Sequence, residues 1–311
     1  MNTNTDPVNT APLLEHSFSA MASPCKFLLP ATFAGVQDIA RSMEAEVRRI
    51  EQKYSRYRDD SVLSNINRNA GQPTTIDDET AWLLNYASVC FSQSDGLFDI
   101  SSGVLRSVWN FRDGRCPSAE QLHSVLPRIG FAALQCHNNQ LHMPATMELD
   151  FGGIGKEYAA DAAANIARQH GIAWGVVDLG GDLHIIGPRL SDNGEAIPWM
   201  LGVRHPREAQ SAFASLPVYS GGMATSGDYE RYFEANGRRY CHILNPHTGY
   251  PVEHWASVTV LAPSCLLAGS LSTISMLKGA AASDWLRQQQ LHALLIDTAM
   301  QAQALRPTAE Q

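Results

Sequence analysis

The spacing of apolar residues along the chain predicts a mixture of helices and strands. Apolar side chains recur at three- and four-residue steps from Val36 to Tyr57, which predicts a long helix with one apolar stripe. A second helix should begin near Asp78 and carry Trp82, Leu83, Tyr86 and Val89, and Ser118 with Gln121 forms the capping-box pattern that opens a third. Later helices are predicted around 158–166 and over 265–277.

Apolar runs between these helices predict strands. Tyr229–Glu234 and Arg238–Leu244 flank Asn236–Gly237, the strongest short hairpin signal in the chain. Further strands are predicted over Ser17–Leu29, Trp174–Leu179, Leu183–Ile186, Trp255–Ala262 and His292–Asp297. The order lacks a regular βαβ alternation, which favours an α+β fold with mixed helices and antiparallel sheet over a doubly wound sheet. We expect a flexible tail over residues 1–15 and a domain over 16–311, with two subdomains as one arrangement.

Composition narrows the class of protein. A formal net charge of -8 without a Lys/Arg-rich run makes nucleic acid an unfavourable partner. The six cysteines form no C-x-x-C pair, and their spacing suits neither a zinc site nor a disulfide framework. The polar N-terminal segment resembles no signal peptide, and no apolar run reaches the roughly 18 residues of a membrane span. The expectation is a cytoplasmic protein.

The segment LDFGGIGKEYAAD, Leu149 to Asp161, places glycines ahead of a helix. Backbone N–H groups at such a helix start can bind an anion, or the glycines can simply make a tight turn. The segment is not a P-loop, because Asp150 and Glu157 stand where that motif needs Gly and Ser or Thr. Lys156 could bind phosphate or be a solvated charge at the helix start.

Three other segments combine polar groups with apolar surroundings. Asp99 lies between apolar residues in SDGLFDISSGVL, where it could hold a ligand or bond nearby backbone. In the helix LLAGSLSTISMLKG, Gly269 and Thr273 share a face that could serve a site or only close packing. The third segment surrounds the predicted hairpin, where a binding site is favoured by the polar residues Thr225, Ser226, Asp228, His242, Asn245, His247 and Thr248.

Taken together, these segments resemble the FAD:protein FMN transferase (ApbE) family from about Phe18 to about Gly279. The resemblance rests on ordered motifs: AMASPC, YSRY with SVLSNIN, DGLFDISSGVLRSVWNF, LDFGGIGKEYAAD, DLGGDL, ATSGDYERYF and CHILNPHTGYPV. It implies a T-fold-like core and binding of FAD with a divalent metal, usually Mg²⁺. The implied reaction transfers FMN to a Thr or Ser hydroxyl of a target protein and releases AMP. Two alternatives are an FAD-binding protein without transferase activity and a metal-dependent FAD pyrophosphatase.

Roles for individual residues follow from the resemblance together with the chemistry of their side chains. Lys156 is a candidate phosphate partner, and the hydroxyl proton would pass to His242, with Asp228 behind it. The metal ligands would be the Gly155 carbonyl, Ser272 and Thr273. FAD would contact Met21, Tyr57, Leu97, Phe98, Asp99, Gly152, Lys156, Tyr158, Thr225, His242 and Ile243.

The sequence departs from the family pattern at two positions. Gly269 stands where the family commonly has a metal-binding aspartate, which should weaken the Mg²⁺ site. Glu157 stands where the family usually has glycine, and three roles are open for it: an alternative ligand, a base, or an acidic residue favoured in the first helical turn. The acceptor protein, the oligomeric state and the choice of metal stay open.

Overall fold

The computed structural model describes residues 12–191, 193–208 and 210–308, which divide into two compact units. The first unit comprises 12–51, 156–225 and 261–269, and the second comprises 52–155, 226–260 and 270–308. The boundary falls inside α1 (Val36–Tyr54), α5 (Gly155–Gln169), β12 (Gly221–Gly227), β15 (Trp255–Ala262) and α6 (Cys265–Lys278).

The strands of the first unit form a sheet in the order β1-β2-β6-β7-β12. The other elements wholly within this unit are two short strands and a two-stranded hairpin. Apolar side chains of the central strands form its core, which includes Val176, Ile185, Trp199 and Met223. The bounds are β1 Leu13–Ala20, β2 Ser23–Pro30, β6 Gly175–Leu179, β7 Asp182–Gly187, β8 Arg189–Leu190, β9 Ala196–Ile197, β10 Trp199–Arg204 and β11 Ala212–Val218.

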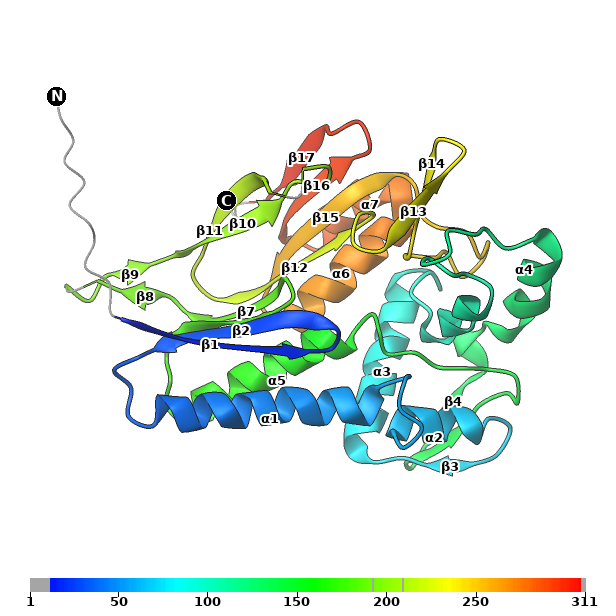
Figure 1. Ribbon diagram of the computed structural model, residues 1–311, viewed down its shortest axis with the longest axis horizontal. Coiled ribbons are helices and arrows are strands. Elements are labelled where there is room, and N and C mark those ends of the chain that lie inside the picture. The colour runs from blue at the N-terminus through cyan, green and yellow to red at the C-terminus, as the bar shows by residue number, and fades with distance from the viewer. Residues whose placement is uncertain (1–11, 192, 209, 309–311) are drawn as a thin grey trace. The chain divides into compact units, whose positions relative to one another are not determined.

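Two tight turns determine how this sheet begins. The single strand predicted over Ser17–Leu29 is wrong, because β1 and β2 are antiparallel partners joined at Met21 and Ala22 (Figure 1, blue). Both turn residues are left-handed, with φ of 52° and 58°. The sequence has neither glycine nor asparagine there, so the usual hairpin signal is missing. The predicted pair of strands around Gly180–Gly181 is confirmed as the antiparallel β6–β7 hairpin.

The second unit contains most of the helices, neighbouring strands in the order β15-β16-β17, a small sheet in the order β3-β5-β4 and the pair β13-β14. The predicted hairpin around Asn236–Gly237 is confirmed as β13–β14, with φ of 53° and 74° at the two turn residues. The bounds are α2 Val62–Arg68, β3 Thr74–Thr75, α3 Asp78–Gln93, η1 Ile100–Ser107, α4 Ala119–Val125, η2 Leu126–Arg128, η3 Phe131–Ala133, β4 Gln135–His137, β5 Gln140–His142, β13 Tyr232–Ala235, β14 Arg238–Cys241, η4 Gly279–Ala281, α7 Ala282–Gln288, β16 His292–Asp297 and β17 Ala302–Leu305.

Helix predictions are confirmed in position but corrected in detail. The capping box of α4 is present, since Ser118 and Gln121 satisfy each other's backbone N–H groups. The long helix α1 ends at Tyr54, so Tyr57 lies beyond it and is 77% exposed. In α3, Trp82 and Val89 are exposed, although both were predicted to belong to its apolar pattern. The buried residues of this helix are Thr80, Leu83, Leu84, Ala87 and Cys90.

The N-terminal residues and one apolar stretch near the C-terminus differ from what the sequence predicted. Residues 1–11 of the predicted tail lie outside the described residues, whereas Leu13–Glu15 belong to β1. One 24-residue stretch, Cys265–Gln288, satisfies the length and composition criteria for a membrane span, which the sequence reading did not anticipate. Of its most apolar window, 67% is buried inside the protein, and a core helix meets the same criteria in this way.

Candidate functional site

The glycine turn of the second unit is held by Asp150. The carboxylate of Asp150 accepts a hydrogen bond from the Gly152 N–H at 2.8 Å and pairs with the Arg56 guanidinium. A Cβ added at Gly153 would lie 3.3 Å from Cζ of Phe98, so glycine allows the Phe98 ring to pack directly on the turn. Two predicted flavin contacts, Phe98 and Gly152, therefore lie at one place in this unit.

Asp99 follows Phe98 in the chain and is buried, and both of its carboxylate oxygens accept hydrogen bonds from protein groups. Its Oδ1 accepts hydrogen bonds from the Ser101 N–H at 2.7 Å and the Ser101 hydroxyl at 2.6 Å. Its Oδ2 accepts a hydrogen bond from the Phe131 N–H at 3.1 Å. Asp99 therefore caps the N-terminus of η1. Bonding to nearby backbone was one of the two roles that the sequence left open for it.

Tyr57 presents an exposed aromatic ring close to Arg56. The Arg56 guanidinium lies 4.9 Å from the centre of the ring and donates a 2.8 Å hydrogen bond to the phenol oxygen. Because Arg56 is also paired with Asp150, it connects the exposed ring to the anchor of the glycine turn. Leu97, the remaining member of the predicted contacts in this loop, is half-buried.

In the first unit, Lys156 is paired with Asp182 at the start of β7. Nζ of Lys156 donates to Oδ2 of Asp182 at 2.7 Å, and the backbone of Thr225 also hydrogen-bonds that carboxylate. Burial by itself would lower the pKa of Lys156, but the charges of Asp182 and Glu157 outweigh it and raise the pKa well above the ordinary value. Lys156 is therefore a fixed cation at every physiological pH.

The ammonium of Lys156 also lies beside the glycine turn that joins β6 to β7. A Cβ built on Gly180 would be 3.7 Å from Nζ of Lys156 and only 2.6 Å from Cβ of Ser23. Gly180 has a φ of +67°, so both its conformation and its surroundings favour glycine. The turn in the motif DLGGDL therefore lies close to both Ser23 and the Lys156 ammonium.

Asp161 ties α5 to the first turn of α6 within this unit. Its carboxylate accepts hydrogen bonds from the N–H groups of Cys265 at 2.8 Å and Leu266 at 3.0 Å. His184 Nδ1 contacts the same carboxylate, and Arg168 donates to His184 Nε2 at 2.7 Å. Because Arg168 can only donate, Nε2 is the acceptor and the proton is on Nδ1, facing Asp161.

Glu157 lies one turn before Asp161 on α5 and faces Gly269 on α6. It is only 8% exposed, and its Oε2 has no hydrogen-bond partner in the part of the chain that the structure describes. Burial and then the neighbouring Asp182 carboxylate raise the pKa of Glu157 to about 8. Glu157 occupies the first helical turn, as anticipated, but it is not a solvated surface acid.

Hydroxyl groups converge between the end of β12 and α6 in the second unit. The Ser226 hydroxyl lies 2.8 Å from the Ser272 hydroxyl and 2.9 Å from the Thr273 hydroxyl. Ser272 is fully buried and Thr273 is half-buried. The two hydroxyls predicted as metal ligands therefore lie together, and Ser226, which the sequence did not single out for this role, connects them.

The candidate acid–base residues of this unit have different surroundings. Asp228 is buried, its backbone N–H is bonded to the Ala256 carbonyl, and its carboxylate lies 3.4 Å from a nitrogen of Arg239. His242 is exposed just after β14, and Ile243 beside it is buried. Asp228 is thus buried beside a cation, whereas His242 is an exposed residue.

Met21 and Tyr158 complete the predicted contacts that belong to the first unit. The Met21 N–H, in the left-handed turn between β1 and β2, donates to Oε1 of Glu51 at 2.5 Å. A hollow of about 400 Å³ adjoins this turn and includes Ala20, Ala22 and Glu51 among its lining residues. Tyr158 is half-buried on α5.

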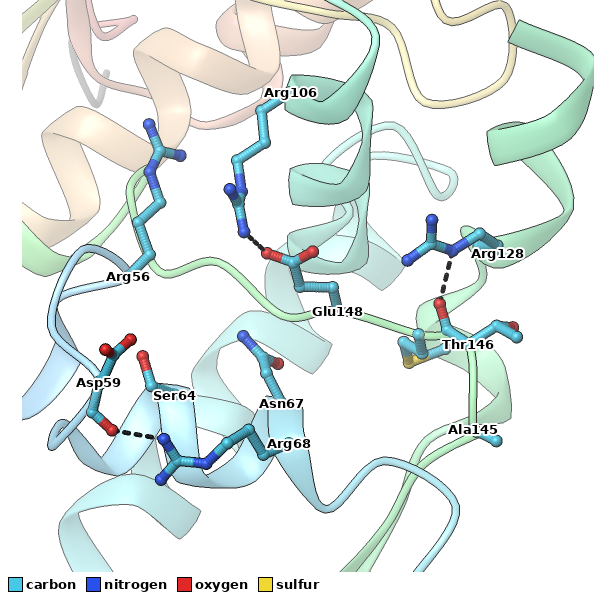
Figure 2. A pocket seen from close by; sticks show the side chains of 11 residues that line it. Arg56, Asp59, Ser64, Asn67, Arg68, Arg106, Arg128, Ala145, Thr146 and Glu148 are labelled. Carbon is cyan, nitrogen blue, oxygen red and sulfur yellow. Dashed lines mark hydrogen bonds and ion pairs between the residues drawn. The ribbon is translucent and has the colours of Figure 1, made fainter. Parts of the chain in front are cut away.

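A second pocket, which the sequence did not indicate, lies within the second unit. The cavity has a volume of about 320 Å³, and the residues that line it include Arg56, Arg68, Arg106 and Arg128. Figure 2 shows these side chains. Arg106 is paired with Glu148, and Arg128 donates to the Thr146 carbonyl at 2.7 Å. These arginines are far apart in sequence, so no run of basic residues announced the pocket.

Comparison with known proteins identifies one family. The model of the ApbE family matches residues 21–295. The chain belongs to the ApbE family. Among curated relatives, the FAD:protein FMN transferase of Escherichia coli K12 is 30% identical over 254 residues, which cover 78% of this chain and 71% of that protein. The FAD:protein FMN transferase of Treponema pallidum is 31% identical over 247 residues, which cover 74% and 68%.

Solved ApbE structures have the same fold. The ApbE protein of Thermotoga maritima superimposes with a TM-score of 0.86 and 31% identity, over 94% of this chain and 97% of that one. The flavinyl transferase ApbE of Pseudomonas stutzeri, in its apo form, gives a TM-score of 0.84 and 26% identity, over 97% of each chain. The predicted α+β fold of mixed helices and antiparallel sheet is therefore confirmed.

Two pairings in this ApbE chain were not predicted from the sequence. The Lys156 partner Asp182 was part of a quoted motif, DLGGDL, but nothing in the sequence paired the two residues. The contact of Glu157 with Gly269 joins positions more than a hundred residues apart. In the described ranges, no group of three or more His, Cys, Asp and Glu side chains has the arrangement of a metal site.

Proposed function

We propose that this chain is an FAD:protein FMN transferase, which moves FMN from FAD to a hydroxyl of an acceptor flavoprotein. The observation that carries the proposal is the match to the ApbE family over 21–295, with relatives of about 30% identity that bear this activity in their names. The Lys156–Asp182 ion pair and the hydroxyl cluster around Ser226 offer a cation and oxygen donors suited to phosphate chemistry, which supports the proposal.

The proposed reaction exchanges one phosphorus–oxygen bond for another. A Thr or Ser hydroxyl oxygen of the acceptor forms a bond to the FMN phosphorus of FAD, and the bond to the AMP oxygen breaks. AMP leaves with that oxygen, and the hydroxyl proton passes to a base. His242 suits the role of base because it is an exposed residue, whereas Asp228 is already held by Arg239 and would instead support the site electrostatically.

Charge neutralisation is the other requirement of such a transfer. Lys156 is a permanent cation beside the Gly180 turn, so it is suited to a phosphate oxygen of the pyrophosphate. An imidazole and an ammonium do not by themselves offset the charge that develops on departing AMP. A divalent metal bound near the pyrophosphate would supply that additional stabilisation.

Mg²⁺ fits the donor groups that the chain offers. Magnesium prefers oxygen ligands and is commonly held by one or two carboxylates together with substrate phosphates and water. The residues predicted as ligands in the second unit offer such oxygens: the hydroxyls of Ser272 and Thr273, which lie 2.8 Å and 2.9 Å from the Ser226 hydroxyl, and the Gly155 carbonyl.

One experiment separates the proposed transferase from its alternatives. The protein is incubated with FAD and Mg²⁺, with and without an acceptor flavoprotein, while AMP and protein-bound flavin are both measured. A transferase yields AMP and covalent FMN in equal amounts and only with the acceptor. A pyrophosphatase releases AMP and free FMN without it, and a binding protein retains FAD and releases no AMP under either condition.

A further inference from the structure

Helices α5 and α6 approach each other through two contacts that are one helical turn apart. Asp161 on α5 accepts hydrogen bonds from the backbone of Cys265 and Leu266 at the start of α6. Four residues earlier on α5 is Glu157, and four residues later than Cys265 on α6 is Gly269. Since residues four apart share a helix face, the first contact fixes the second and brings Glu157 against Gly269.

The space between Glu157 and Gly269 admits only one side chain. A Cβ built on Gly269 would lie 2.5 Å from Cγ of Glu157, 2.8 Å from Oε1 and 3.0 Å from Cδ. Real side-chain carbons do not approach so closely. The glutamate therefore occupies the room that any side chain at position 269 would need, and a residue larger than glycine at 269 is incompatible with this position of Glu157.

The charges around this contact leave one carboxylate uncompensated. Lys156 forms its 2.7 Å ion pair with Asp182, and both are largely buried. Glu157 lies near the same pair, so two carboxylates share one ammonium. Glu157 is 8% exposed, and within the described ranges its Oε2 accepts no hydrogen bond. A buried carboxylate in that state calls for a proton or a cation, because buried charges in proteins are paired or coordinate metals.

We propose that Glu157 is the side-chain carboxylate that binds the divalent cation in this chain, and that Gly269 provides the space for it. The two departures noted in the sequence are then one exchange, in which the carboxylate comes from α5 instead of α6. This inference rests on the proposed function for the presence of Mg²⁺. The sequence alone led us to expect that Gly269 weakens the Mg²⁺ site. With Glu157 as a ligand, the site keeps a carboxylate and need not be weaker.

Metal binding itself provides the test. Mn²⁺ replaces Mg²⁺ as the probe, and its free concentration is followed by electron paramagnetic resonance in protein alone and in protein with FAD. The variant Glu157→Gln keeps the size of the side chain and removes its charge. We expect it to weaken Mn²⁺ binding by about tenfold or more. The matched control Glu44→Gln, which alters a carboxylate of α1 paired with His16 and Arg48, should leave the Mn²⁺ affinity unchanged.

An exchange of the two residues tests the steric half of the proposal. Gly269→Asp alone should lower thermal stability and should not tighten Mn²⁺ binding, because it forces two carboxylates into space for one. The double variant Glu157→Gly, Gly269→Asp should recover both stability and Mn²⁺ affinity to near the parent values. Recovery in the double variant guards against the objection that either single variant merely folds poorly.

The outcomes distinguish this inference from the proposed function. Unchanged Mn²⁺ affinity in Glu157→Gln, in a protein that still transfers FMN, would overturn the role of Glu157 and leave the transferase intact. Tight Mn²⁺ binding that depends on Glu157, in a protein that releases no AMP, would refute the transferase and leave the metal ligand intact. A parent protein that binds no Mn²⁺, with or without FAD, would also overturn the inference.

Discussion

Replacing Gly269 with alanine perturbs the contact between α5 and α6 by one methyl group. The new Cβ would meet Cγ of Glu157 at 2.5 Å, which lies about 1 Å inside ordinary van der Waals contact. Glu157 is buried and its neighbours Lys156 and Asp182 are paired, so the side chain cannot swing freely into solvent. The strain must therefore be relieved by small shifts of the two helices.

The expected magnitude follows from two opposing effects. Overpacking of a well-packed interior costs about 1–3 kcal/mol. Replacing glycine by alanine within a helix contributes about 1 kcal/mol in the opposite direction, because it reduces the freedom of the unfolded chain. We expect Gly269→Ala to reduce the free energy of unfolding by about 1 kcal/mol in the parent protein. In a Glu157→Ala background the same substitution should increase it by about 1 kcal/mol.

Urea unfolding of the four proteins in this cycle measures the coupling between the two positions. The predicted coupling energy is about 2 kcal/mol. Gly155→Ala serves as the control, since a Cβ at Gly155 meets nothing within 4 Å and the position begins a helix. That variant should be neutral or slightly stabilised. Equal effects of Gly269→Ala with and without Glu157 would show that the two side chains do not compete for space.

Three further predictions concern charge and hydroxyl groups. Lys156→Met should lower the free energy of unfolding, measured in urea, by about 3 kcal/mol, because it leaves the buried Asp182 carboxylate without its cation. Partial burial opposes ionisation of Asp77, but hydrogen bonds from Lys53 and Thr80 prevail and lower its pKa to about 2. Asp77→Asn should thus lower the free energy of unfolding by about 1 kcal/mol at pH 7, a value that allows for solvent screening of the half-exposed carboxylate. The difference in stability between variant and parent should be lost as the pH falls from about 4 to about 2. Ser226→Ala should lower the free energy of unfolding by about 1 kcal/mol and weaken Mn²⁺ binding. A variant that binds Mn²⁺ as tightly as the parent would show that the hydroxyl cluster is not part of the metal site.

The sequence predicted those parts of the fold that depend on local chemistry. The apolar stripe of α1, the capping box at Ser118 and the Asn236–Gly237 turn were all found where expected. The β1–β2 turn was missed because Met21 and Ala22 adopt left-handed conformations without the residues that usually favour them. That conformation is stabilised by tertiary contacts, such as the bond from Met21 to Glu51, which a local pattern cannot reveal.

The candidate site was only partly accessible from the sequence, because its important pairs are distant along the chain. The motifs identified Lys156, Ser272 and Thr273, but only the structure showed that Asp182 pairs with the lysine and that Ser226 contacts both hydroxyls. Gly269 and Glu157 were each noted as a departure from the family pattern. Nothing in the sequence indicated that they touch, since the pairing depends on how Asp161 joins α5 to α6.

The most direct test of the transferase assignment counts product in both halves of the reaction. Purified protein, FAD, Mg²⁺ and an acceptor flavoprotein are combined, and AMP is quantified by chromatography while covalent flavin on the acceptor is quantified by mass spectrometry. The assignment predicts one AMP released for each FMN attached, and no AMP when the acceptor hydroxyl is removed by Thr-to-Ala substitution. AMP that forms without attached FMN, or FAD that stays intact with every acceptor hydroxyl present, would contradict it.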